Sequence, residues 1–335
     1  MSHVAVAVSR IWKGWSHWAF NPADTAPMAA LRIAVGLLTI GWTLSLLPDA
    51  ETFLSDSGLV PDLPFYNLGA WAVQLGSPYV VLGVLLAAAV ALVLGWRTRA
   101  AAVIVFILLV AIQRRDPFVL NSGDQLLRVL AFFVMLMPAG ETWSLDARRR
   151  GYERLRAPWA LRVLQVQVSA LYLFAVWAKV RGVAWNDGTA VGIALQLEDL
   201  ERFSVPATLA TSLLFSTLLT YSSLLVEAAL AIGLWLPRLR YWVMAAGIGL
   251  HMGIEMTLLI GWFSFAVVAS YLAFVEPEHL RGAARWLQKH RTAPVQAEAG
   301  RSEQRVQRRS RRSSSPNRRW ALKRKLTSNR GPSEP

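Results

Sequence analysis

The chain has 335 residues, of which 54% are hydrophobic and 17% are charged. This composition excludes a soluble enzyme, a disordered protein and a coiled coil. Cysteine is absent, which excludes disulfides, a thiolate nucleophile and cysteine-ligated metal sites. The five histidines lack close metal-binding spacing, so we expect no metal site. The net charge of +14 is concentrated in residues 277–335, which hold sixteen Lys and Arg but only four Glu.

Residues 1–25 are predicted to lie along the membrane interface before the first membrane span. In this segment Trp12, Trp15 and Trp18 stand close to Arg10. Clustered tryptophans next to basic residues are typical of an amphipathic helix that lies in the plane of the interface.

Eight apolar segments follow. A spanning helix needs about 20 mostly apolar residues, and the candidates are residues 27–47, 78–96, 99–113, 123–139, 160–180, 212–236, 239–258 and 259–276. We therefore predict an all-α, polytopic membrane helix bundle over residues 26–277, with about eight transmembrane helices. The boundary between the last two is expected near Gly261.

The basic residues between these segments predict the orientation. Lys and Arg gather near both termini and in the second, fourth and sixth connections, whereas the first connection is acidic. Because short cytoplasmic loops are enriched in Lys and Arg, both termini are predicted to be cytoplasmic. Arg114 and Arg115, in the third connection, run against this pattern. We expect a multi-pass protein of a bacterial plasma membrane.

Residues 278–335 form a basic tail that is rich in Arg and Ser. The stretch 301–330 has almost no apolar residues, so we expect it to be disordered. The expected partners are the lipid bilayer and, for the tail, anionic lipid head groups. The alternative is a solvated tail that only fixes topology, and no specific nucleic acid is expected.

Polar residues inside three of the apolar segments are predicted to face one interior cavity. Ionisable groups in hydrocarbon are costly and frequently mark functional sites. Residues four or seven apart share a helix face, and the groups that do so are His251 with Glu255, Asp124 with Arg128, and Gln165 with Tyr172 and Lys179.

Lys179 and His251 are the predicted catalytic residues. Lys179 is expected to act as a general base, His251 to shuttle a proton, and Glu255 to orient His251. The alternative for Lys179 is that its side chain extends to the membrane interface, as long basic side chains do.

Three other intramembrane charges are interpreted as structural. Arg32 is predicted to pair with Glu227, and Arg128 with either Asp124 or Glu255. Such pairs would stabilise the bundle, because an unpaired charge in hydrocarbon is strongly unfavourable.

Short motifs occur in a definite order along residues 20–276. They are Asn21-Pro22-Ala23-Asp24, Leu31-Arg32, Asn121-Ser122-Gly123-Asp124, Leu130-Ala131-Phe132, Trp143-Ser144-Leu145-Asp146, Phe174 to Lys179 with Trp185 and Gly188, His251, Ile260-Gly261 and Phe263-Ser264-Phe265. In order and spacing they resemble the HTTM (horizontally transferred transmembrane) domain family, which includes the vitamin K-dependent γ-carboxylase.

The resemblance implies a multi-helix membrane domain. By analogy with the carboxylase, it also implies that a lysine abstracts a proton from a reduced, vitamin K-like quinone. The family's catalytic lysine is the second of a Lys-Lys pair, which reads Lys179-Val180 here, and its functional histidine is replaced by Gly123. These departures disfavour true γ-glutamyl carboxylation. The pocket predicted around the two catalytic residues consists of Asn121, Asp124, Tyr172, Trp185 and Glu255.

Three functions stay open at this point. The first is carboxylase-like acid–base or redox chemistry on a lipid-soluble quinone. The second is a non-enzymatic membrane transporter or a partner subunit. The third is a structural membrane domain that anchors the basic tail.

Overall fold

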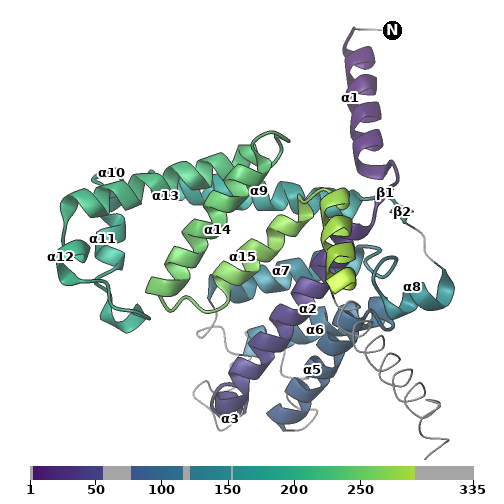
Figure 1. The fold of residues 1–335 in the computed structure, drawn as a ribbon, viewed down its shortest axis with the longest axis horizontal. Coiled ribbons are helices and arrows are strands. Elements are labelled where there is room, and N and C mark those ends of the chain that lie inside the picture. The colour runs from purple at the N-terminus through teal and green to yellow at the C-terminus, as the bar shows by residue number, and fades with distance from the viewer. Residues whose placement is uncertain (1–2, 56–76, 116–120, 152–153, 291–335) are drawn as a thin grey trace, which may run out of the picture. The chain divides into compact units, whose positions relative to one another are not determined.

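The computed structural model describes residues 3–55, 77–115, 121–151 and 154–290, which are mostly helical (Figure 1). The chain divides into two units after Leu280, and the elements named here belong to the first. The α-helices are α1 (His3–Phe20), α2 (Ala26–Leu46), α3 (Ala50–Leu54), α5 (Pro78–Leu94), α6 (Thr98–Arg115), α7 (Ser122–Leu136), α8 (Leu145–Arg150), α9 (Trp159–Lys179), α10 (Val183–Asn186), α11 (Ala190–Ala194), α12 (Ala207–Ala210), α13 (Leu213–Gly233), α14 (Arg240–Thr257) and α15 (Phe263–Ser270).

Three short 3₁₀ helices and two short strands complete this unit. The 3₁₀ helices are η1 (Leu47–Asp49), η2 (Glu198–Leu200) and η3 (Tyr271–Ala273). Strands β1 (Ala23–Asp24) and β2 (Leu155–Arg156) pair antiparallel, with Ala23 opposite Arg156. This pairing ties the start of α2 to the segment before α9. The tail that was predicted to be disordered over residues 301–330 lies outside the described residues.

Each of the eight predicted apolar segments corresponds to one helix. In chain order these helices are α2, α5, α6, α7, α9, α13, α14 and α15. Three helical stretches in the described part of the chain are long and apolar enough to cross a membrane, namely Ala26–Leu54, Trp159–Lys179 and Leu213–Gly233. Two shorter apolar helices are Pro78–Leu94 and Phe263–Ala273. The α-helical fold is thus observed together with three candidate spans, while eight spans and cytoplasmic termini stay predictions.

Helix α5 shows how the local sequence determines where a helix begins and ends. The hydroxyl of Ser77 accepts a hydrogen bond from the backbone N–H of Tyr79, and Pro78 occupies the first helical position, which are both common helix starts. The helix ends at Gly95, whose φ is +67°, a conformation that favours glycine. A Cβ atom at Gly95 would lie 2.2 Å from the Cβ of Ser144, so glycine also permits close packing there.

The long helices pack in two groups that meet at α15. In the first group α2 packs on α5, α5 on α6, and α6 on α7; in the second α9 packs on α13 and α13 on α14 (Figure 1). Helix α15 contacts α2, α7 and α14. The polar residues of α9, α13 and α14 therefore lie in one group, whereas those of α7 lie where this helix meets α15.

Helix α1 carries the tryptophans that were expected at the membrane interface. Trp12 and Trp15 are exposed. Trp18 packs inward, with its ring centroid 6.1 Å from that of Trp235 and the guanidinium of Arg162 above its face. Trp18 therefore anchors the C-terminal end of α1 on the bundle.

Arg32 is completely buried and binds backbone carbonyls instead of a carboxylate. Its guanidinium donates to the carbonyl oxygens of Ala139 (3.2 Å), Val93 (3.5 Å) and Trp143 (2.6 Å). The predicted pair with Glu227 is therefore wrong. Val93 belongs to the last turn of α5, where carbonyls lack a partner inside the helix, and α2 packs directly on that helix.

The predicted partners of Arg128 also bind other groups. Asp124 accepts hydrogen bonds at the start of α7, and the carboxylate of Glu255 binds Arg202 at 2.5 Å. Arg128 instead lines a small cavity of about 270 Å³ together with Arg114. The predicted pairing of Arg128 is therefore wrong: Arg128 forms no ion pair within 4.0 Å among the described residues, and both carboxylates bind other donors.

Candidate functional site

A cavity of about 530 Å³ lies among α9, α10, α11, α13 and α14. Most of its lining is apolar, and the polar side chains are few: Lys179, Ser222, Ser223, Glu227 and Thr257. Pockets for small molecules typically combine an apolar wall with a small number of polar groups. The cavity therefore suits a lipid-soluble molecule that carries a few polar atoms.

Lys179 lies at the wall of this cavity, at the last position of α9. Its ammonium group forms an ion pair with the carboxylate of Glu227 on α13, and it lies 4.7 Å from the ring centroid of Trp185 on α10. Both neighbours line the same cavity. The structure thus brings together the predicted catalytic lysine, the predicted pocket tryptophan and a charge that had been assigned a structural role.

His251 lies outside the cavity lining, in a buried polar cluster with two tyrosines. Its Nε2 is 3.1 Å from the hydroxyl of Tyr172, and that hydroxyl also hydrogen-bonds the hydroxyl of Tyr271. The Nδ1 of His251 is buried and has no hydrogen-bond partner among the described residues. Helix α14 lines the cavity with another face, which includes Gly249 and Gly253.

The ion pair and the buried cluster are electrostatic neighbours. The charge of Lys179 acts on His251, and the charge of Glu227 acts on both Tyr172 and Tyr271. In a region of low dielectric constant such interactions extend further than in water. A proton gained or lost at the cavity wall is therefore expected to affect the cluster behind it.

Asn121 and Asp124 cap α7 and do not line the cavity. The Asn121 side chain accepts from the backbone N–H groups of Gly123 (2.7 Å) and Asp124 (3.1 Å). Asp124 in turn accepts from the Asn121 N–H at 3.0 Å and from the Trp42 indole at 2.6 Å. This reciprocal arrangement is a capping box, and it engages the side chains of both predicted pocket residues.

Gly123 is required by a close approach of two backbones. A Cβ atom at this position would lie 2.4 Å from the backbone nitrogen of Phe263, so a histidine side chain does not fit. The ring of Phe263 packs against that of His251, with centroids 5.7 Å apart. The start of α7 therefore reaches His251 indirectly, through the first residue of α15.

Glu255 helps to fix a segment at the rim of the cavity. Its carboxylate binds Arg202, whose own backbone N–H donates to the carbonyl of Thr257 at 3.0 Å. Leu258 also forms an isolated β-bridge with Glu201. Thr257 and Leu258 both line the cavity, so these contacts hold the rim at the end of α14.

Sequence reasoning missed Tyr271 and Arg202 as contributors to this region. Tyr271 is a single tyrosine in an apolar segment, and Arg202 lies in a polar connection, so neither gives a periodic signal. Val180, at the position that the resemblance assigns to the family's catalytic lysine, is 45% exposed and does not line the cavity. Lys179, one position earlier, does line the cavity.

Comparison with known proteins agrees with this architecture. The chain is 26% identical over 196 residues to the "Uncharacterized protein YitO" of Bacillus subtilis (strain 168), which covers 55% of this chain and 62% of YitO. The chain thus spans less than two thirds of that relative's length. No solved structure matches. The model of the HTTM domain matches residues 20–279, and together with the three apolar helices it indicates a membrane protein. The resemblance is therefore confirmed: the chain belongs to the HTTM domain family.

Proposed function

We propose that this HTTM protein binds a lipid-soluble quinone, or a molecule of that class, in the cavity among α9, α13 and α14, and supports acid–base chemistry there. The observation that carries this proposal is an apolar cavity with the Lys179–Glu227 ion pair at its wall. An apolar molecule fits the lining, and its polar atoms would contact the charged groups of Lys179 and Glu227.

The polar atoms of the site fit such a ligand. The Oε2 atom of Glu227 is buried and has no hydrogen-bond partner among the described residues, so it is available to a bound molecule. Trp185 offers an aromatic surface on the other side of Lys179. We infer that Glu227, Lys179 and Trp185 hold the ligand's polar end, while the aliphatic residues of α11 and α14 surround the rest.

A reduced quinone would supply an acidic hydroxyl and reducing equivalents when bound. Lys179 holds or accepts a proton at Nζ, and Glu227 balances that charge at its carboxylate. Each group can exchange a proton with the other because they are in hydrogen-bond contact. The apolar lining limits the access of water to Glu227, whose side chain is 8% exposed, and this favours transfer of the proton between these two residues.

His251 is proposed to hold a second proton behind the cavity wall. Its Nε2 is fixed by Tyr172, which leaves the unpartnered Nδ1 free to bind or release a proton. Asn121 and Asp124 contribute by holding α7 against α15, next to His251. Glu255 contributes by holding the cavity rim through Arg202.

The proposal includes an eight-span, multi-pass topology in a plasma membrane, with both termini in the cytoplasm. The support is the match between eight apolar segments and eight helices, together with the basic connections two, four and six. Helix α15 has eight residues, or about 12 Å at about 1.5 Å per residue. Its crossing must therefore include η3 and the irregular residues on either side. The basic tail is proposed to bind anionic head groups.

Mass spectrometry of co-purified lipids tests the quinone proposal. Wild-type protein, Lys179→Met and the control Arg181→Gln would be extracted with their native lipids. Arg181 is exposed, lies over Trp177 and does not line the cavity. A quinone enriched over the bulk membrane in the wild type and the control, but lost in Lys179→Met, supports the proposal. Equal quinone content in all three proteins and the bulk membrane contradicts it.

A second candidate function is transport of a small molecule. The short helices α10 and α11 line the cavity, and so does Leu258, which directly follows α14. Discontinuous helices around a binding site are common in transporters. Uptake of a solute by proteoliposomes, without any enriched quinone, would favour this alternative.

A further inference from the structure

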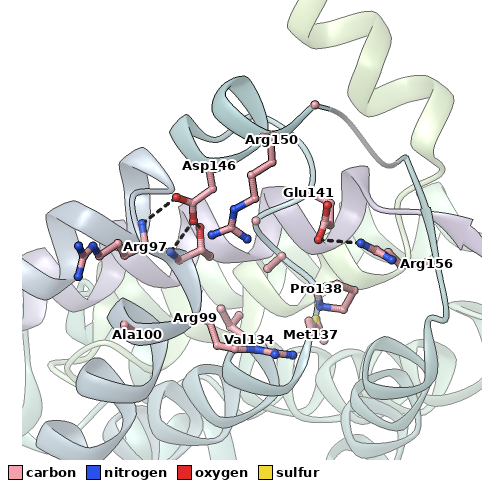
Figure 2. A pocket seen from close by; sticks show the side chains of 15 residues that line it. Arg97, Arg99, Ala100, Val134, Met137, Pro138, Glu141, Asp146, Arg150 and Arg156 are labelled. Atoms are coloured by element: carbon pink, nitrogen blue, oxygen red, sulfur yellow. Dashed lines mark hydrogen bonds and ion pairs between the residues drawn. The ribbon is translucent and has the colours of Figure 1, made fainter.

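A second cavity, of about 570 Å³, lies where the α5–α6 turn meets the segment that follows α7 (Figure 2). Four arginines and two carboxylates line it, so its wall carries a net positive charge. The charged lining residues are Arg97, Arg99, Arg150, Arg156, Glu141 and Asp146. The second and the fourth of the basic connections between the apolar segments thus meet at one hollow.

Both carboxylates of the cavity are engaged by protein donors. Asp146 accepts from the backbone N–H groups of Arg97 (2.9 Å) and Thr98 (2.7 Å), and from the Thr98 hydroxyl (2.8 Å). Glu141 pairs with Arg156 at 3.3 Å. Asp146 therefore caps α6, and Glu141 neutralises a single arginine.

Three of the four arginines, Arg97, Arg99 and Arg150, form no ion pair within 4.0 Å among the described residues. The charge of Arg150 acts on Asp146 from a longer distance, and the carboxylate of Asp146 is itself bound by Thr98 and Arg97. Figure 2 shows the side chains of Arg99 and Arg150 reaching toward the cavity from opposite sides, whereas the guanidinium of Arg97 points away. A guanidinium presents a planar set of donors that matches phosphate oxygens in a two-point contact.

The floor of this cavity is held by buried contacts. Arg32 binds the carbonyls of Ala139 and Trp143 from below. Gly140 packs so closely on Thr98 that a Cβ atom would lie 2.8 Å from the Thr98 hydroxyl. The hollow is therefore formed before a ligand arrives, which lowers the entropic cost of binding.

The cavity also lies at the ends of apolar helices. The turn 95–97 joins α5 to α6, and Trp96 within this turn is exposed. Tryptophans next to the ends of apolar helices commonly mark the head-group level of a bilayer. Lipid phosphates lie at that level, which makes them one available source of anionic ligand.

We propose that this cavity is a binding site for a phosphate group, held between Arg99 and Arg150. The phosphate comes either from an anionic phospholipid head group or from free phosphate in the adjacent solution. This site is separate from the proposed quinone cavity and does not depend on it.

Thermal unfolding of the full-length protein in maltoside micelles tests the proposal, with intrinsic tryptophan fluorescence as the readout. Dioleoyl phosphatidylglycerol and inorganic phosphate are added separately at constant ionic strength, and the apparent dissociation constant is obtained from the rise in Tm. The variant is Arg99→Gln/Arg150→Gln. The matched control is Arg148→Gln/Arg149→Gln, which removes the same charge from exposed positions of α8 that do not line the cavity.

We expect binding about tenfold weaker in Arg99→Gln/Arg150→Gln, since charge-assisted hydrogen bonds are lost, and unchanged binding in the control. A Tm rise with lipid alone identifies a head-group site, and a rise with both ligands identifies a general phosphate site. No Tm rise in the wild type, or equal weakening in both double variants, would overturn the proposal. If Arg99→Gln/Arg150→Gln does not fold, Arg150→Gln alone is compared with Arg149→Gln by the same criteria.

Discussion

The ammonium group of Lys179 and the carboxylate of Glu227 form an ion pair between α9 and α13, at the edge of a largely apolar cavity. The Glu227 side chain is 8% exposed and the Lys179 side chain 25%. The buried carboxylate of Glu227 therefore depends on Lys179 more than Lys179 depends on it, and a double-mutant cycle can measure the interaction between the two groups.

Removing one member of this pair is expected to destabilise the protein more than removing both. Breaking a fully buried pair costs about 3–5 kcal/mol, and the partial exposure of Lys179 reduces our expectation to about 2 kcal/mol for Glu227→Gln or Lys179→Met. The double variant should recover at least half of that loss. Unfolding in mixed micelles of SDS and maltoside measures the three free energies. Losses that simply add in the double variant would show that the groups do not interact.

Arg32→Leu should prevent assembly of the helix bundle. The substitution leaves the carbonyls of Val93, Ala139 and Trp143 without their donor, and each buried unsatisfied group costs about 1–3 kcal/mol. Arg32→Lys should retain part of the stability because an ammonium group can still reach some of these carbonyls. The yield of monodisperse protein in gel filtration is the measurement, with Arg10→Leu as a surface control. A normal yield of Arg32→Leu would refute the structural role.

Gly123→Ala should destabilise the protein by about 1–3 kcal/mol, in the range of overpacked cores. The added methyl group would collide with the backbone of Phe263, which cannot move aside like a flexible side chain. Gly253→Ala is the matched control, since a Cβ atom at Gly253 would have no neighbour within 4 Å and alanine favours helix. Melting temperatures should therefore fall for the first variant and stay or rise for the second.

The stability contributed by Asp146 should be lost in acid. Burial raises the pKa of this carboxyl, but hydrogen bonds from Thr98 and Arg97 and the charge of Arg150 outweigh burial, so its pKa lies below the usual 3.8. A lowered folded-state pKa means that the contribution is complete above about pH 4 and declines as the pH falls further. Asp146→Asn should therefore lower Tm at pH 7 and make less difference near pH 3. An equal difference at both pH values would contradict this assignment.

The absence of cysteine allows a direct test of topology. Single cysteines at Glu51 and Arg148 would be labelled with a membrane-impermeant maleimide, from outside intact cells and after lysis. The proposed orientation places the first connection outside and the fourth inside, so Glu51→Cys should react in intact cells and Arg148→Cys only after lysis. The reverse pattern would show that the protein has the opposite orientation in the membrane. Labelling of both residues in intact cells would show that the number of spans between them differs from the proposed one.

The positions of the long helices could be predicted because uninterrupted apolar runs indicate them directly. Helix ends were less visible, although Asn121 and Asp124 have the three-residue spacing of a capping box. Those two residues were instead predicted to line a pocket. A polar pair at the start of an apolar helix satisfies free backbone N–H groups, and this need accounts for their hydrogen bonds without a ligand.

The members of the candidate site could be recognised as ionisable residues in apolar segments, but their partners could not. A residue's face on its own helix does not identify the neighbouring helix. Glu227 was therefore assigned to Arg32, although α13 packs on α9 and brings it to Lys179. Tyr271 joined the cluster only through the packing of α15 and η3 near α14, a contact without a local sequence signal.

The acceptors of Arg32 bear on the order in which the protein is made. Val93 and Trp143 lie 61 and 111 residues after Arg32, so neither acceptor exists when α2 leaves the ribosome. At synthesis rates of roughly 5–20 residues per second, the last acceptor follows after roughly 5–20 seconds. During that interval the Arg32 guanidinium must be hydrated or held by the insertion machinery. The first apolar helix of the chain can therefore reach its final place only after the fourth has been made.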